Sequence, residues 1–129
     1  MKHDPLNDAL SVINNAERSG KLKCEVSPAS KLIGRVLKVM QENGYIESFE
    51  YVENNSGGIF NITLMGNINK CQVIKPRWTL KRNEIEDYES RYLPAQNFGV
   101  LIITTNKGVL SNTDAKVQGV GGKLLAYIY

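Results

Sequence analysis

The stretch that decides the fold begins Phe98-Gly-Val-Leu-Ile-Ile-Thr-Thr-Asn-Lys-Gly108 and continues to Tyr129. Its apolar run is typical of a buried strand, and the run ends abruptly in two hydroxyls, an amide, a lysine and a glycine. A short helical segment, a Gly-rich turn and a second apolar run follow. Residues 98–129 therefore predict a sheet edge that presents hydrogen-bonding groups rather than a catalytic centre.

The residues before this stretch complete a second module, residues 67–129. Residues 70–75 and 78–82 are predicted strands, and Asn83 is expected to cap a short acidic helix over residues 84–90. Asn112 or Thr113 is expected to cap the helical segment after Gly108. This module is predicted to be mostly antiparallel β with short helices.

The first half, residues 1–66, reads as an α-β-α-β-β module. Asp4-Pro5 and Ser27-Pro28 each pair a capping side chain with a proline, so both are expected to open helices. Residues 45–52 and 59–65 flank turn residues and predict a β-hairpin. The fold class is therefore α+β, with two small modules.

Composition excludes several classes of protein. No apolar run approaches the roughly 18 residues that a membrane span needs, and the chain starts without a secretory signal, so a cytoplasmic protein is expected. The cysteines, Cys24 and Cys71, are expected to be free thiols. With one histidine, His3, neither a zinc site nor a nucleophile–base pair is expected. We expect no metal, no cofactor and no enzyme activity.

The net charge of +3 is unevenly distributed. Residues 1–66 hold seven Lys and Arg against eight Asp and Glu, whereas residues 67–129 hold nine against five. A basic second half suits a polyanionic partner, although many ordinary surfaces share this bias.

The glycines of residues 119–122 precede Lys123 but fail the phosphate-loop pattern. That pattern requires Ser or Thr after the lysine and a helix behind it, whereas Leu124 follows here and leads into a strand. The glycines are expected to form a turn, and their lack of side chains would also let a flat partner approach the backbone.

Two polar segments remain as candidate sites. Thr104-Thr-Asn-Lys107 offers hydroxyl and amide groups that suit the wide minor groove of RNA, but the same residues are ordinary turn chemistry. Lys31, Arg35 and Lys38 share one face of the second helix, where they are either solvated or in contact with phosphates. The residues alone leave both alternatives open.

Taken together, the motifs resemble ribosomal protein eight of the small subunit in its archaeal-type form. The resemblance covers essentially the whole chain. It is carried by Asp4-Pro5-Leu6 with Asp8, Leu10, Ile13 and Asn15, by Ser30-Lys31-Leu32, by Val39-Met-Gln-Glu-Asn-Gly-Tyr-Ile46, by Thr104-Thr-Asn-Lys-Gly-Val109 and by Gly121-Gly-Lys123.

The resemblance implies a structural protein of the ribosome that binds a helix in the central domain of small-subunit ribosomal RNA and supports its assembly. It also implies neighbouring ribosomal proteins as partners and, as in some bacterial members, binding to its own messenger RNA. The implied RNA-binding residues are Asn15, Ser30, Lys31, Arg35, Thr104, Thr105, Asn106, Lys107, Gly108, Gly121, Gly122 and Lys123.

Two departures from the bacterial pattern affect which of these RNA-binding roles can be carried over to this chain. Bacterial members carry Ser-Thr-Ser-Lys-Gly where this chain has Thr104-Thr-Asn-Lys-Gly108, and they carry Glu where Lys123 stands. An interaction made through that carboxylate does not transfer to Lys123. The alternative function is a protein–protein adaptor that uses an exposed β surface.

Overall fold

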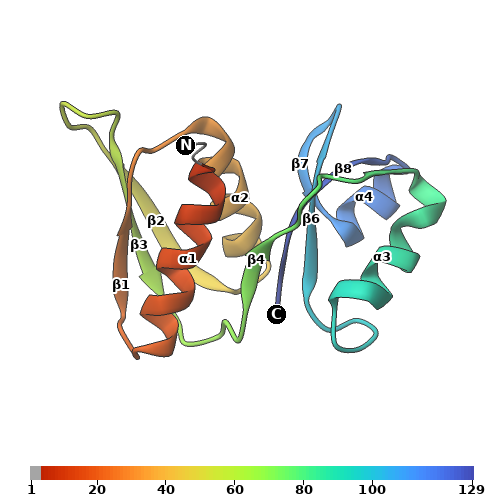
Figure 1. Cartoon of the computed structure of the whole chain (residues 1–129), viewed down its shortest axis with the longest axis horizontal. Helices are drawn as coiled ribbons and strands as arrows, with labels where there is room; N and C mark the ends of the chain where they lie inside the picture. The colour runs from red at the N-terminus through yellow and green to blue at the C-terminus, as the bar shows by residue number, and fades with distance from the viewer. Residues whose placement is uncertain (1–3) are drawn as a thin grey trace. The chain divides into compact units, whose positions relative to one another are not determined.

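The computed structural model describes residues 4–129 of the chain (Figure 1). The chain forms two compact units, Met1–Cys71 and Gln72–Tyr129, and each is described by itself. Both combine helices with antiparallel sheets, which confirms the predicted α+β class. Within the described range, no helix is long and apolar enough to cross a bilayer.

The helices of the first unit are α1 (Pro5–Arg18) and α2 (Lys31–Glu42). As predicted, Asp4 caps α1, and its carboxylate accepts a hydrogen bond from the Asn7 amide at 3.2 Å. The prediction that Ser27-Pro28 opens α2 is wrong, because Ser30 is the cap and accepts from the Ile33 amide at 3.1 Å. Residues 27 and 28 form a bend before the helix, and the Ala29 amide donates to the Gly58 carbonyl.

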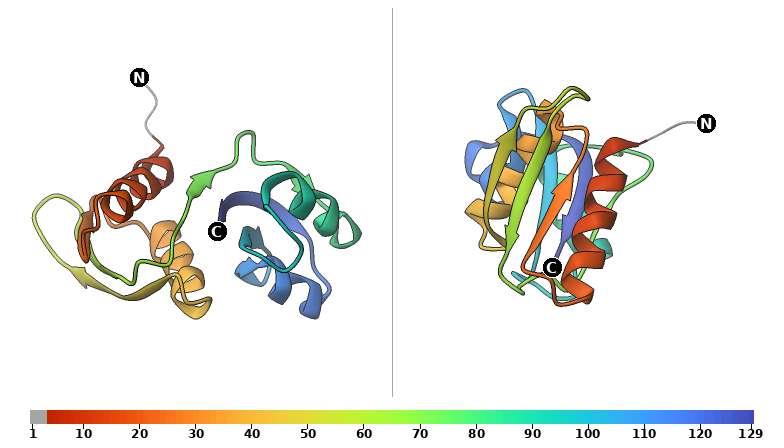
Figure 2. Two further views of the ribbon diagram at one scale, coloured as in Figure 1. Left: turned by 90° about the horizontal axis from the view of Figure 1, so that it is seen from below. Right: turned by 90° about the vertical axis from the view of Figure 1, so that its left-hand side faces the viewer.

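The sheet of this unit contains β1 (Lys23–Val26), β2 (Ile46–Val52) and β3 (Ile59–Leu64) in the order β1-β3-β2. The predicted hairpin of β2 and β3 is confirmed. Both helices cover one face of the sheet (Figure 2). The helices contribute ten buried apolar residues to that core: Leu6, Ala9, Leu10, Ile13, Ala16, Ile33, Val36, Leu37, Val39 and Met40.

Side chains of α1 hold the segment that leaves the first unit. The Asn14 side chain both accepts from the Cys71 amide, at 2.9 Å, and donates to the Cys71 carbonyl. Three residues on, the Glu17 carboxylate accepts from the Ile68 amide at 2.9 Å. Asn14 therefore satisfies the backbone donor and acceptor of Cys71.

Both cysteines are free, as predicted. Burial, with a smaller contribution from the charge of Glu17, raises the pKa of the Cys24 thiol to about 11 and that of Cys71 to about 12. Because only the thiolate reacts readily, these thiols are protonated and unreactive at neutral pH. Their role in the fold is packing.

The second unit is built on a five-stranded antiparallel sheet. Its strands are β4 (Cys71–Val73), β5 (Thr79–Leu80), β6 (Val100–Thr105), β7 (Gly108–Ser111) and β8 (Gly122–Ile128). Their order is β4-β8-β6-β7, and β5 also pairs with β8. The strand β7, which the sequence did not predict, makes residues 106 and 107 the connection of a hairpin.

Three short helices complete the unit: η1 (Arg82–Glu84), α3 (Ile85–Tyr92) and α4 (Asn112–Gln118). Their apolar residues pack with one face of the sheet. The core formed there contains Ile74, Leu80, Ile85, Leu93, Leu101, Ile103, Ala115, Leu124 and Tyr127.

Both predicted caps in this unit are wrong. Asn83 lies inside η1, and the Glu84 carboxylate instead accepts from the Lys81 amide at 2.7 Å. Ser111 caps α4 by accepting from the Asp114 amide at 3.1 Å. Asn112 is therefore displaced from the capping position and buried within the first turn of α4.

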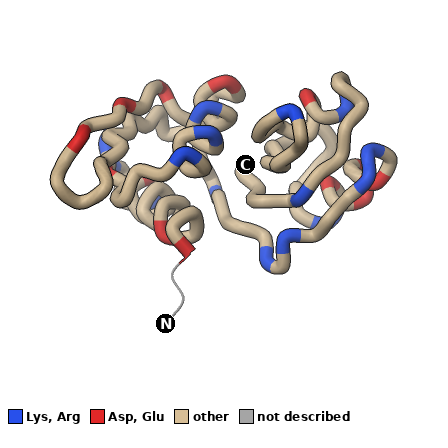
Figure 3. The backbone as a smooth tube through the Cα atoms, turned by 90° about the horizontal axis from the view of Figure 1, so that it is seen from above, with Lys and Arg blue, Asp and Glu red and all other residues tan. Residues whose placement is uncertain are grey.

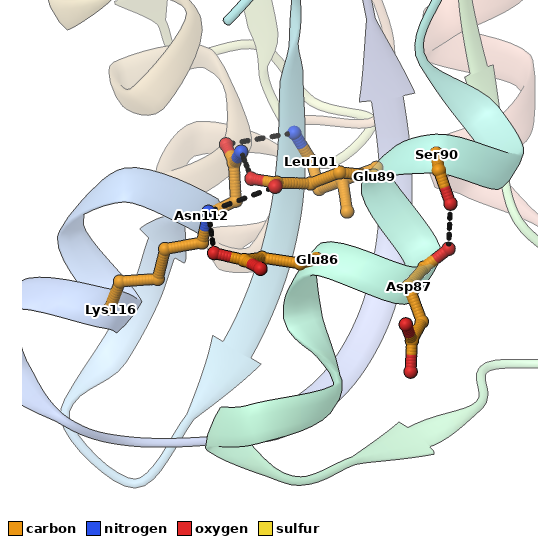
Figure 4. Close-up of polar contacts among 7 residues, drawn as sticks. All are labelled: Glu86, Asp87, Glu89, Ser90, Leu101, Asn112 and Lys116. Carbon is orange, nitrogen blue, oxygen red and sulfur yellow. Dashed lines mark hydrogen bonds and ion pairs between the residues drawn. The ribbon is translucent and has the colours of Figure 1, made fainter. Parts of the chain in front are cut away.

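Asn112 joins three elements of the unit (Figure 4). Its carbonyl oxygen accepts from the Leu101 amide of β6 at 3.2 Å, and its amide donates to the Glu89 carboxylate of α3. Glu89 also accepts from the Lys116 ammonium at 2.9 Å. The Glu89 side chain is only 22% exposed. It links α3 to α4.

Candidate nucleic-acid interface

The β6–β7 turn presents the polar residues that end the strongest apolar strand. Thr105 pairs with Gly108 across the hairpin. The Thr105 hydroxyl donates to the Gly108 carbonyl at 2.8 Å and accepts from the Lys107 amide at 3.0 Å. Gly108 has a φ of +106°, which glycine adopts without the strain that a side chain would cause. Thr105 and Gly108 thus fix the shape of the turn.

The neighbouring side chains remain available to a ligand. Asn106 and Lys107 are exposed and Thr104 is partly exposed. Among the described residues, none forms a side-chain hydrogen bond with Thr104 or Asn106. A hydroxyl and an amide that both donate and accept are therefore presented on a rigid turn.

Thr104 belongs to a row of side chains that crosses four strands. Residues paired across antiparallel strands point to the same face, and Thr104 pairs with Val109 on β7 and with Lys123 on β8. Lys123 pairs in turn with Thr79 on β5. The ammonium-bearing side chain of Lys123 therefore stands between two threonines, on the face opposite the core residues Ile103 and Leu124.

Gly121 and Gly122 permit close approach between strands. A Cβ on Gly122 would clash with the carbonyl oxygen of Thr104, and one on Gly121 would clash with that of Leu80. These glycines therefore let β8 approach its neighbours on both sides. This packing accounts for them without any ligand, and their contact with RNA stays a prediction.

The basic row on α2 is exposed. Lys31, Arg35 and Lys38 are all solvent-accessible, while Ser30 anchors the helix start through its cap hydrogen bond. Asn15 is likewise exposed on α1. These residues all belong to the first unit, whereas the hairpin turn belongs to the second.

Lys107 and Lys123 carry charges that no acidic side chain neutralises within residues 4–129. Lys116, by contrast, pairs with Glu89 at 2.9 Å and with Glu86 at 3.9 Å. Figure 3 shows Lys and Arg positions interspersed along the second unit, with the acidic residues gathered in fewer segments. An anionic ligand would find unpaired cations beside the polar turn.

Metal-ligating side chains do not gather into a site within the described part of the chain. No group of three His, Cys, Asp or Glu side chains within it could hold a metal ion. The polar groups of the turn are hydroxyls, an amide and an ammonium, which recognise ligands by hydrogen bonding and charge.

Comparison with known proteins identifies the family. The model of the family described as ribosomal protein S8 matches residues 4–129. This chain belongs to that family. It is 56% identical to the small ribosomal subunit protein uS8 of Picrophilus torridus and of Thermoplasma acidophilum, and 57% identical to that of Archaeoglobus fulgidus. Each comparison extends over 129 residues and covers the whole of both chains.

Membership of the S8 family confirms the predicted resemblance and its archaeal type. It also confirms that the chain is a ribosomal protein and not an enzyme. The individual RNA-binding residues remain predictions, because the match covers the chain as a whole.

Sequence reasoning missed Thr79 as a neighbour of this surface. Thr79 lies 44 positions before Lys123 in the chain, and only the pairing of β5 with β8 brings them together. Because β5 contains two residues, its alternation is too short to reveal which side chains share a face.

Proposed function

We propose that this protein is a structural component of the small ribosomal subunit that binds directly to a helix in the central domain of small-subunit ribosomal RNA. The relatives named small ribosomal subunit protein uS8 support the subunit, since they match the chain over its full length. The protein would support assembly by holding this RNA helix in its folded form.

The observation that carries the RNA-binding role is the rigid turn with free polar groups. Thr104 and Asn106 offer a hydroxyl and an amide for ribose hydroxyls and base edges, which RNA displays in its wide minor groove. Thr105 and Gly108 hold the turn in shape, so little conformational entropy is lost on binding. Lys107 supplies a phosphate contact.

Lys123 takes a different role from the glutamate of bacterial members. It pairs with Thr104 in the sheet, so its charge lies beside the Thr104 hydroxyl, which is one of the groups proposed to contact riboses and base edges. A cation at this position binds phosphate, whereas a carboxylate would accept hydrogen bonds from bases or riboses. Because Gly121 and Gly122 have no side chains, an RNA strand can approach the backbone before Lys123 closely.

The first unit supplies a second contact in this proposal. Lys31 and Arg35 are one helical turn apart on α2 and both exposed, so they can meet phosphates along one strand. Ser30 and Asn15 would add hydrogen bonds to the RNA backbone. Neighbouring ribosomal proteins are the further partners, and its own messenger RNA is a partner if it contains a similar helix.

Replacing Asn106 by alanine is expected to weaken binding to a central-domain transcript by ~1–2 kcal/mol, because the RNA groups that it pairs would be left unsatisfied. Filter binding at several salt concentrations measures this change in affinity. The matched control is Gln96→Ala, which removes an exposed amide elsewhere in the same unit. Equal affinities for the Asn106 variant and the control would remove Asn106 from the site.

A further inference from the structure

The start of η1 lies beside the glycines that precede Lys123. A Cβ on Gly121 would stand 3.0 Å from the Lys81 Cα and 3.0 Å from the Arg82 amide nitrogen. A Cβ on Gly122 would stand 3.2 Å from the Thr105 Cα. Gly121, just before β8, and Gly122, its first residue, therefore lie against residues 81–82 on one side and Thr105 on the other.

The orientation of residue 81 follows from the strand before it. Leu80 points into the core and Thr79 lies in the exposed row with Lys123 and Thr104. Because Lys81 keeps an extended backbone, with φ −86° and ψ 160°, its side chain returns to the face of that row. The strands β5 and β6 flank β8, so they lie about 10 Å apart.

Arg82 lies against the other end of the Gly-rich segment. Its guanidinium Nη1 is 3.3 Å from the position that a Cβ on Gly119 would occupy. Gly119 ends α4 in a left-handed conformation, and a side chain there would crowd the guanidinium. Arg82 is exposed at the C-terminal end of α4, on the helix-covered side of the sheet, whereas Lys81 shares the face of Lys123.

Lys81 and Arg82 are exposed and form no ion pair with the residues that the structure describes. The acidic group nearest in sequence is Glu84, whose carboxylate is engaged by the backbone amide of Lys81 at 2.7 Å. Two cations without an ion pair therefore stand at this position. β8, which carries Lys123, lies between them and β6, the strand that leads into the polar turn.

We propose that Lys81 and Arg82 form a phosphate-binding corner that extends the RNA surface from the polar turn across β8. This inference rests on the proposed function, and it adds a pair of residues that bind the phosphates of the same RNA. The turn reads the minor groove, and the Lys81–Arg82 corner binds phosphates of the RNA backbone on the far side of Lys123. The corner carries no sequence information of its own, because every nucleotide offers the same phosphate.

The test is RNA binding by Lys81→Gln, by Arg82→Gln and by the double variant, at salt concentrations from about 50 to 300 mM. Each single change is expected to lower affinity for the central-domain transcript by about threefold to tenfold at roughly 0.1 M salt. The slope of log affinity against log salt should become shallower by about one for each phosphate that the variant no longer binds. The variants should also bind an unrelated RNA duplex more weakly, by a similar factor. Lys81→Arg should retain binding.

The matched control is Arg91→Gln, which neutralises an exposed cation on α3. Arg91 lies with its guanidinium 5.0 Å from the Tyr88 ring centre, on the helical side of the sheet. If Lys81→Gln and Arg82→Gln keep the affinity and salt slope of this control, the corner does not bind phosphate. If the unchanged protein fails to select the central-domain transcript over the unrelated duplex, the proposed function fails first. Thermal unfolding of each variant distinguishes weaker RNA binding from partial unfolding.

Discussion

Replacing Gly122 by alanine is expected to lower the stability of the second unit by about 3 kcal/mol or more, because the added methyl group has no room. The obstacle is backbone, the carbonyl of Thr104 with the Thr105 Cα behind it, and backbone inside a sheet cannot rotate away. β8 would have to separate from β6 beside the polar turn. We expect the melting temperature to fall by about 10 °C or more, and RNA binding to weaken with it.

Calorimetry or circular dichroism measures this change, with Gly44→Ala as the control. Gly44 has a φ of +78° but no atom within 4 Å of its added Cβ, so alanine there costs about 1 kcal/mol of backbone strain. If both variants lose the same small amount of stability, the close packing of β8 against Thr104 would not be the reason for glycine at position 122.

Replacing Asn112 by alanine is expected to cost about 2–4 kcal/mol, since it removes the partners of two groups at once. The amide of Leu101, a fully buried residue, would lose its acceptor, and the half-buried Glu89 carboxylate would lose a donor. The side-chain hydrogen bond to β6 would be lost, and the Lys116–Glu89 contact would remain between α3 and α4. Denaturant unfolding of the intact protein measures this decrease in stability.

Thr113→Ala serves as the comparison for Asn112, because Thr113 is the next residue of α4 and is exposed. It should change stability by no more than about 0.5 kcal/mol. A decrease in stability in Asn112→Ala as small as this would show that the buried hydrogen bonds do not hold α3 in place.

Much of the fold was predictable because its signals are local. The apolar stripe of α1, its Asp4 cap and the β2–β3 hairpin depend on residues a few positions apart, and periodicity and turn chemistry report such contacts well. The free thiols were predicted from composition. The family followed from several motifs that occur in order along the whole chain.

The features that sequence reasoning missed depend on residues distant in the chain. Several residues near the helix starts offer a hydroxyl or an amide. Local patterns could not distinguish the true cap of α2, Ser30, from Ser27, or the true cap of α4, Ser111, from Asn112 and Thr113. Asn112 is drawn inward by Glu89 and Leu101, which lie 23 and 11 residues away. The row of Thr79, Lys123 and Thr104 likewise exists only through strand pairing.

Hydroxyl-radical footprinting of small-subunit ribosomal RNA with this protein tests the central claim most directly. We expect the protein to protect the minor-groove side of one helix in the central domain. With Asn106→Ala, the most strongly protected nucleotides should lose their protection. Gln96→Ala should leave the footprint unchanged. Protection confined to another domain, or no protection at concentrations where the protein is folded, would contradict direct recognition of the central domain by the Thr104–Lys107 turn.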